Sequence, residues 1–80
     1  MNVERLRTLG VTFARNRMVG LPAEDAGLLL YRDVEQLRAA AAANGVAWLK
    51  MQLAERVYAK AALAEWRRIH AAMSSQWGNA

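Results

Sequence analysis

The side chains that could perform acid–base or nucleophilic chemistry are few and poorly grouped in this sequence. His70 and Ser74 are four residues apart, a spacing that places a base and a hydroxyl on one face of a helix. Nucleophilic catalysis also needs an orienting group and an oxyanion hole, and no glycine-rich turn after a strand supplies them. Glu55 and Glu65 lie about 80° apart around a helix and do not converge as paired catalytic carboxylates do. We therefore expect that this protein is not an enzyme.

Residues that hold metals or cofactors are equally scarce. The 80 residues contain no cysteine and one histidine, which removes thiolate and multi-histidine metal sites. Phosphate-binding loops and dinucleotide fingerprints are absent as well. We therefore predict no cofactor and no metal site. Because Glu4, Arg5 and Arg7 interrupt the apolar region that a secretory signal needs, and because cysteine is absent, we expect a cytoplasmic protein.

Arginine and lysine are the first candidate binding residues, since eleven basic residues against seven acidic ones leave a net charge of +4. Nine of the eleven are arginine, whose guanidinium group suits phosphate oxygens. A small basic nucleic-acid-binding protein is therefore the alternative function. It would contact the phosphate backbone through Arg5, Arg7, Arg15, Arg17, Arg56, Lys60 and Arg67. A solvated basic face explains the same pattern, because no motif of a DNA- or RNA-binding module accompanies it.

A stripe of large apolar residues near the C-terminus is the second candidate. Aromatic residues, methionine and arginine are enriched where proteins bind one another, although apolar residues at helical spacing also form cores. A protein partner is predicted to contact Trp66, Arg67, Ile69, Met73, Trp77 and Trp48. The leading function is a non-enzymatic protein-interaction module, a small adaptor, assembly factor or inhibitor that occupies a surface of a larger protein or nucleoprotein complex. Its small size also suits a protein that is encoded by a mobile element.

Turn-forming residues divide the chain into three segments that are rich in alanine, the best helix former. The first boundary is Gly20-Leu21-Pro22, where proline favours a helix start, and the second is Asn44-Gly45, which suits a helix end and a reversal. The predicted helices span residues 3–18, 22–43 and 46–76. In the middle helix, Ala26, Leu30, Val34 and Leu37 share a stripe, and Leu28 is displaced from it and expected to be exposed.

Residues 8–15 fit two patterns. Val3, Leu6, Leu9 and Phe13 share one face of a helix that Asn2 can cap. Leu9, Val11 and Phe13 also alternate with Gly10 and Thr12, as in a short strand, and Gly10 costs about 1 kcal/mol inside a helix. A lone strand needs a partner strand, and the rest of the chain offers none. We therefore predict a helix here.

The last helix carries two apolar stripes. The first consists of Val46, Leu49, Leu53 and Val57. The second consists of Met51, Tyr58, Ala62, Trp66, Ile69, Met73 and Trp77. A helix that is apolar on two sides must be covered on two sides, by the middle helix and by either the N-terminal segment or another molecule. A homodimer is therefore a candidate assembly.

These patterns predict an all-α fold. We expect a single small helical domain over residues 1–80, a long antiparallel helical hairpin with the N-terminal helix lying across it. The longest uncharged run, residues 39–49, is 11 residues long, whereas about 20 are needed to span a bilayer. We expect no membrane partner, the amphipathic N-terminal segment offering only a weaker third alternative at a membrane surface.

Overall fold

The computed structural model describes the backbone of residues 2–78 and the side chains of residues 2–73. Within this part of the chain it contains three α-helices, one π-helical segment and no strand. They are α1 (Val3–Phe13), η1 (Ala14–Met18), α2 (Ala23–Ala43) and α3 (Trp48–Gly78). The predicted all-α class is confirmed, and when α1 and η1 are taken together the helix ends lie within two residues of the predicted ones.

The first helix begins at a side-chain cap and ends in a wider turn. The side-chain oxygen of Asn2 accepts a hydrogen bond of 3.0 Å from the backbone N–H of Arg5, which satisfies a donor that the helix itself leaves free. After Phe13 the chain continues as η1, in which the N–H of Val19 donates to the carbonyl oxygen of Ala14 at 3.1 Å. Residues 8–15 are therefore helical. The predicted helix is confirmed, and the alternative of a short strand is wrong.

Two glycines with positive φ make the reversals between helices. Gly20 has a φ of 86° and Gly45 a φ of 73°, which side chains with a Cβ rarely adopt. At the second reversal the N–H of Val46 donates to the carbonyl oxygen of Ala41 at 3.0 Å, so the end of α2 is closed by a glycine cap. Both predicted boundaries are therefore turns.

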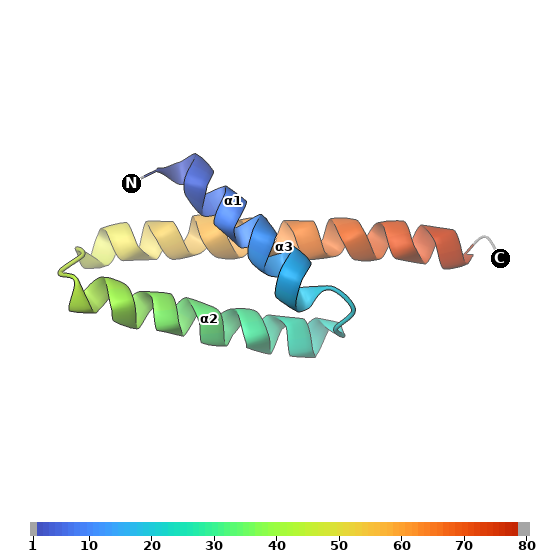
Figure 1. Cartoon of the computed structure of the whole chain (residues 1–80), viewed down its shortest axis with the longest axis horizontal. Helices are drawn as coiled ribbons and strands as arrows, with labels where there is room; N and C mark the ends of the chain where they lie inside the picture. The colour runs from blue at the N-terminus through green and yellow to red at the C-terminus, as the bar shows by residue number, and fades with distance from the viewer. Residues whose placement is uncertain (1, 79–80) are drawn as a thin grey trace.

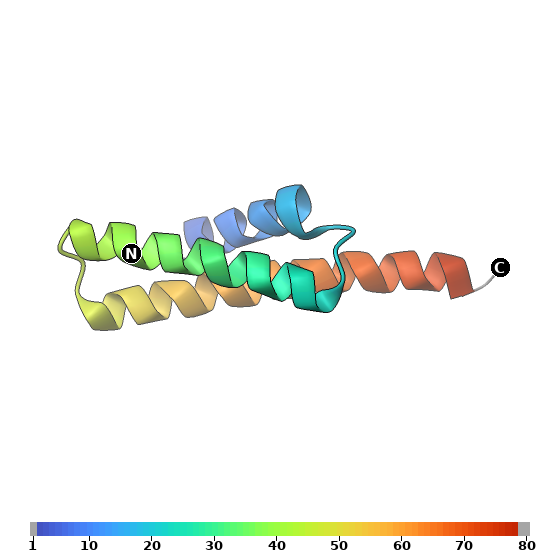
Figure 2. The same cartoon turned by 90° about the horizontal axis from the view of Figure 1, so that it is seen from below.

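The helices α2 and α3 run antiparallel and side by side, and α1 lies across α3 (Figure 1; Figure 2). Because α2 has 21 residues and α3 has 31, the C-terminal part of α3 extends past α2. The predicted hairpin is therefore present in part, and the predicted crossing of the N-terminal helix is observed.

The hydrophobic core lies where η1 and the first half of α2 meet the middle of α3. Its buried members are Ala14, Met18, Ala26, Leu30, Tyr58 and Ala62. The second of the two stripes predicted on the last helix supplies the last two of them. Of the first stripe, Leu49 and Leu53 are exposed, whereas Val57 is half-buried and lines a groove together with Arg7 and Val11 of α1. The N-terminal segment therefore covers only the C-terminal end of that stripe.

None of the helices in the described part of the chain combines the length and the hydropathy that crossing a membrane requires.

Candidate interaction surface

The crossing of α1 over α3 is centred on a glycine. Gly10 is buried, and a Cβ added to it would overlap the backbone oxygen of Tyr58 and come within 3.1 Å of the Cβ of Ala61. The two helix backbones therefore approach more closely than any larger side chain would allow. Since this contact is local, α1 diverges from the rest of the molecule away from it, and a groove opens along each flank of α1.

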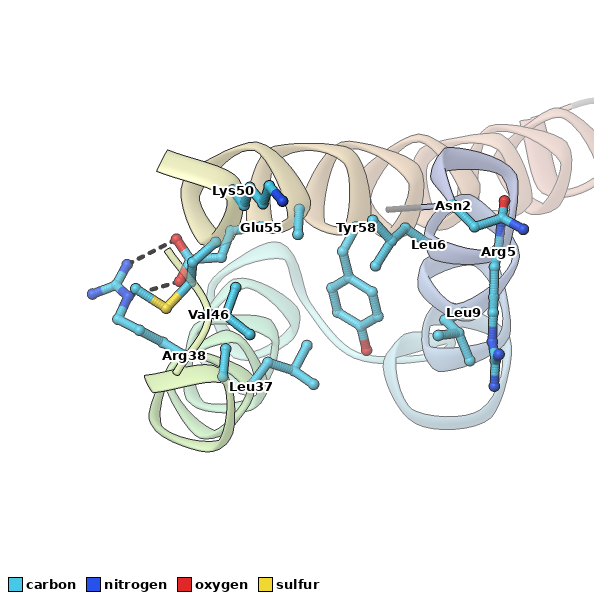
Figure 3. A pocket seen from close by; sticks show the side chains of 13 residues that line it. Asn2, Arg5, Leu6, Leu9, Leu37, Arg38, Val46, Lys50, Glu55 and Tyr58 are labelled. Carbon is cyan, nitrogen blue, oxygen red and sulfur yellow. Dashed lines mark hydrogen bonds and ion pairs between the residues drawn. The ribbon is translucent and has the colours of Figure 1, made fainter. Parts of the chain in front are cut away.

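One groove is apolar and has walls from all three α-helices (Figure 3). Its volume is about 560 Å³, and it lies between the N-terminal half of α1 and the turn that joins α2 to α3. Its apolar lining consists of Leu6, Leu9, Leu37, Ala41, Val46, Met51 and Ala54. We call it the apolar groove. Leu9, Leu37 and Val46 are each exposed, so their side chains are available to a ligand.

The polar groups of the apolar groove divide into paired and unpaired ones. Glu55 accepts two hydrogen bonds from Arg38, at 2.7 and 3.1 Å, and these bonds raise the pKa of the Arg38 guanidinium. This ion pair joins α2 to α3. Arg5 on α1 and Lys50 on α3 are exposed and belong to no ion pair among the described residues. The edges of the groove therefore carry two cations without a counter-charge.

Tyr58 closes the inner end of the apolar groove. Its ring is buried and lies 6.1 Å from the ring of Phe13, centroid to centroid. Its hydroxyl donates a hydrogen bond to Oδ2 of Asp33, and burial together with this contact raises the pKa of the phenol. Because the hydroxyl is satisfied within the protein, the inner end of the groove presents an apolar surface to a ligand.

The other groove, on the opposite flank of α1, is basic. We call it the basic groove; its volume is about 600 Å³, and its charged lining consists of Arg7, Arg56, Lys60, Glu65 and Arg68. The Glu65 side chain is only 6% exposed and accepts hydrogen bonds of 2.5 Å from Arg68 and from Arg15, which lower its pKa to about 2. Arg7 is paired with Glu4 at 2.6 Å. Arg56 and Lys60 are the lining cations outside every ion pair of the described residues.

The residues predicted to contact a protein partner do not form one patch. Trp66 packs against the core and stacks on His70 with 4.3 Å between ring centroids, and its buried Nε1 has no hydrogen-bond partner among the described residues. Ile69 is half-buried, and Arg67 and Met73 are exposed. Trp48 is 63% exposed but lies at the other end of α3, about 27 Å along the helix from Trp66. The side chain of Trp77 lies outside the described residues.

The residues predicted to contact nucleic acid are also divided. Arg7, Arg56 and Lys60 meet at the basic groove. Arg5 lines the apolar groove on the opposite flank of α1, and Arg15 is held by Glu65. Arg17 and Arg67 are exposed and line neither groove.

The one histidine has a structural position. Its Nε2 accepts a hydrogen bond of 3.3 Å from the backbone N–H of Gly20, so His70 ties the loop after η1 to α3. The side chain of Ser74 lies outside the described residues. The described residues also contain no group of three or more His, Asp or Glu side chains placed to hold a metal ion.

No family model, no curated protein and no solved structure matches this chain.

Sequence reasoning missed the apolar residues of the apolar groove and named only Arg5 of its lining, as a phosphate contact. Helical periodicity places Leu6, Leu9 and Leu37 on helix faces that a core would cover, and only the position of α1 leaves them at an open groove. The available signal was Gly10, since a glycine inside a helix opposite the alanines of α3 permits a close crossing. Helical periodicity alone does not say where that crossing lies.

Proposed function

We propose that this chain is a non-enzymatic protein-interaction module of the cytoplasm, a small adaptor, assembly factor or inhibitor that occupies a surface of a larger protein or nucleoprotein complex. The apolar groove carries this proposal. Exposed Leu9, Leu37 and Val46 meet there in one concave surface, and removing such area from water favours association by about 25 cal/mol per Å². Concave apolar surfaces with a few polar groups at their edges are typical of binding sites.

The proposal is tested by capturing partners from a lysate of the source cells, with and without nuclease, on two tagged variants. Leu37→Asp places a carboxylate in the apolar groove, whereas Leu28→Asp places one on an equally accessible part of α2 outside it. We expect a stoichiometric protein that survives nuclease, is lost with Leu37→Asp and is retained with Leu28→Asp. Equal capture by both variants would reject the groove as the binding site.

A nucleic-acid-binding function is the second candidate, and the basic groove favours it. Arg56, Lys60 and Arg7 line one concave surface, and the first two are outside every ion pair of the described residues. Neutralising two or three phosphates of duplex DNA predicts a slope of about −2 to −3 for log Kobs against log salt concentration. Arg56→Ala/Lys60→Ala should reduce that slope by about 2, whereas Lys50→Ala, outside the basic groove, should leave it unchanged. A flat salt profile of the unaltered protein would reject this candidate.

The homodimer stays a prediction, and its candidate contact is the exposed side of α3. Leu49 is 68% exposed there, and Leu53 lies one turn further along the same stripe. If two copies pack through this stripe, Leu49→Asp shifts sedimentation equilibrium toward the monomer. Leu28→Asp on α2 is the matched control, and equal association of both variants would exclude this contact.

A further inference from the structure

We infer that the apolar groove receives an amphipathic α-helix of the partner, one that carries acidic residues beside its apolar stripe. The inference rests on the proposed function and names the chemistry of the partner segment.

The walls of the groove require an occupant that satisfies its own backbone. The walls of the groove are three helices and the turn before α3, and none of them presents a strand edge with which an extended peptide could pair. A helix brings its backbone hydrogen bonds with it.

The lining sets the pattern of the incoming face. Leu6 and Leu9 stand on the α1 side, and Leu37 stands on the opposite side, with Tyr58 between them (Figure 3). The incoming segment must therefore present a continuous apolar face to both sides of the groove. A helix presents such a face when its apolar residues are spaced three and four positions apart. Nucleic acid does not present such a surface, since its outer face is charged phosphate.

The charges at the edges set the sign of the flanking residues. Arg5 and Lys50 lie at the α1 and α3 edges of the groove (Figure 3). Glu55 is the one carboxylate in the lining, and Arg38 already occupies both of its oxygens. Acidic residues on both sides of an incoming apolar stripe would therefore meet cations, and basic residues would be repelled.

The same charges argue against a second copy in this groove. The exposed apolar stripe that this chain could offer, Leu49 and Leu53 on α3, is followed on the same face by the exposed cations Arg56 and Lys60. Inserting that face would place them near Arg5 and Lys50, in a chain whose net charge is already +4. An acidic helix from another protein meets no such repulsion.

Two synthetic helical peptides provide the test. Both peptides are about 15 residues long, which corresponds to about four helical turns. They share one leucine stripe at positions i, i+3, i+4 and i+7, and they differ only in carrying Glu or Lys on both sides of it. Titration of the ¹⁵N-labelled protein should show the Glu peptide binding about tenfold more tightly, with the largest shifts at Leu6, Leu9, Leu37 and Val46.

A charge reversal then identifies the site. Arg5→Glu/Lys50→Glu should invert the preference, so that the Lys peptide binds about tenfold more tightly. Both positions lie in the first turn of a helix, where glutamate suits the helix dipole, so the fold should be retained. Arg56→Glu/Lys60→Glu is the matched control, because it makes the same change of net charge outside the apolar groove and should keep the preference for the Glu peptide.

Each outcome bears on one claim. A preference that Arg5→Glu/Lys50→Glu leaves unchanged, or that the control inverts equally, overturns the inference. If the inference fails in this way while Leu37→Asp still abolishes capture of the cellular partner, the groove binds a protein with a different segment. If Leu37→Asp changes neither peptide binding nor capture, the proposed function falls with the inference.

Discussion

The two halves of α2 carry leucines of the same stripe, yet one half is packed and the other is open. Leu30 and Leu37 are seven residues apart, two turns along one face of the helix, but Leu30 is 4% exposed and Leu37 is 43% exposed. The difference comes from the third element. The π-helical segment η1 contacts both α2 and α3 at the first half of α2, whereas α1 contacts α3 and runs obliquely away from the second half of α2.

This difference shows that hydrophobic patterning and burial are separate properties. Both ends of the hairpin have apolar stripes that would suit a core, and only the end that η1 covers becomes one. The open end keeps its apolar residues in the groove described above and on the outer face of α3, where Trp48 and Leu49 are more than half exposed. The packed end contains the buried core, and the open end supplies the candidate interaction surface.

The strongest way to break this comparison is to disturb the crossing itself. Gly10→Val forces a branched side chain against the backbone of Tyr58, so we expect a loss of about 3 kcal/mol or more in the free energy of unfolding measured with urea. Gly27→Ala is the control, because no atom outside the neighbouring backbone of its own helix lies within 4 Å of the added Cβ, and it should stabilise by about 0.5–1 kcal/mol. Similar effects at the two glycines would mean that the close crossing does not hold the fold together.

The paired leucines of α2 sharpen the comparison directly. Leu30→Ala removes a buried side chain and should cost about 3 kcal/mol in the free energy of unfolding, whereas Leu37→Ala should cost less than about 1 kcal/mol. Urea denaturation of the isolated protein measures both. If Leu37→Ala costs as much as Leu30→Ala, the second half of α2 is covered in solution and is not an open end.

The ion pairs of Glu65 give the packed region a pH dependence. Its pKa is about 2 in the folded protein and 4.5 for the unperturbed group, so the folded state binds fewer protons. The stabilisation is therefore complete above the higher value and is lost as the pH falls from about 5 toward 2. Thermal unfolding should show this slope in the unaltered protein and a flatter slope, with a lower Tm at pH 7, in Glu65→Gln. Parallel profiles would show that these ion pairs do not contribute.

The smallest expected effect concerns the two tyrosines. Tyr58→Phe removes the buried hydroxyl that bonds Asp33 and should cost about 1 kcal/mol in the free energy of unfolding. Tyr31→Phe alters an exposed phenol on α2 and should change stability by a few tenths of a kcal/mol. Equal costs measured with urea would indicate that the Tyr58–Asp33 contact between α2 and α3 contributes nothing beyond an exposed hydroxyl.

The helices themselves were predictable, because their signals are local. Asn2 caps α1 as expected, and the glycine-containing boundaries are both turns with positive φ. Leu28 is exposed, as its displacement from the α2 stripe predicted. Each of these features depends on residues within a few positions of one another, so the sequence alone specifies it.

The candidate site was not predictable in the same way. The size and helical spacing of Trp66 predict a contact with a partner, but the stacking of His70 and the core beneath it leave Trp66 half-buried. The spacing of the groove residues Leu9 and Leu37 is that of apolar residues that face a core. Their exposure depends on the angle at which α1 crosses α3, and no local pattern encodes that angle.

The sequence by itself determined three helices, their boundaries and the apolar stripes along them. Only the tertiary structure decided which ends of those stripes are covered. The physical reason is one long-range contact: Gly10 meets the backbone of α3 at Tyr58 and Ala62, about fifty residues later in the chain, and the helices diverge on either side of it. Helix formation is a local property of the chain, whereas the place where two helices touch is not.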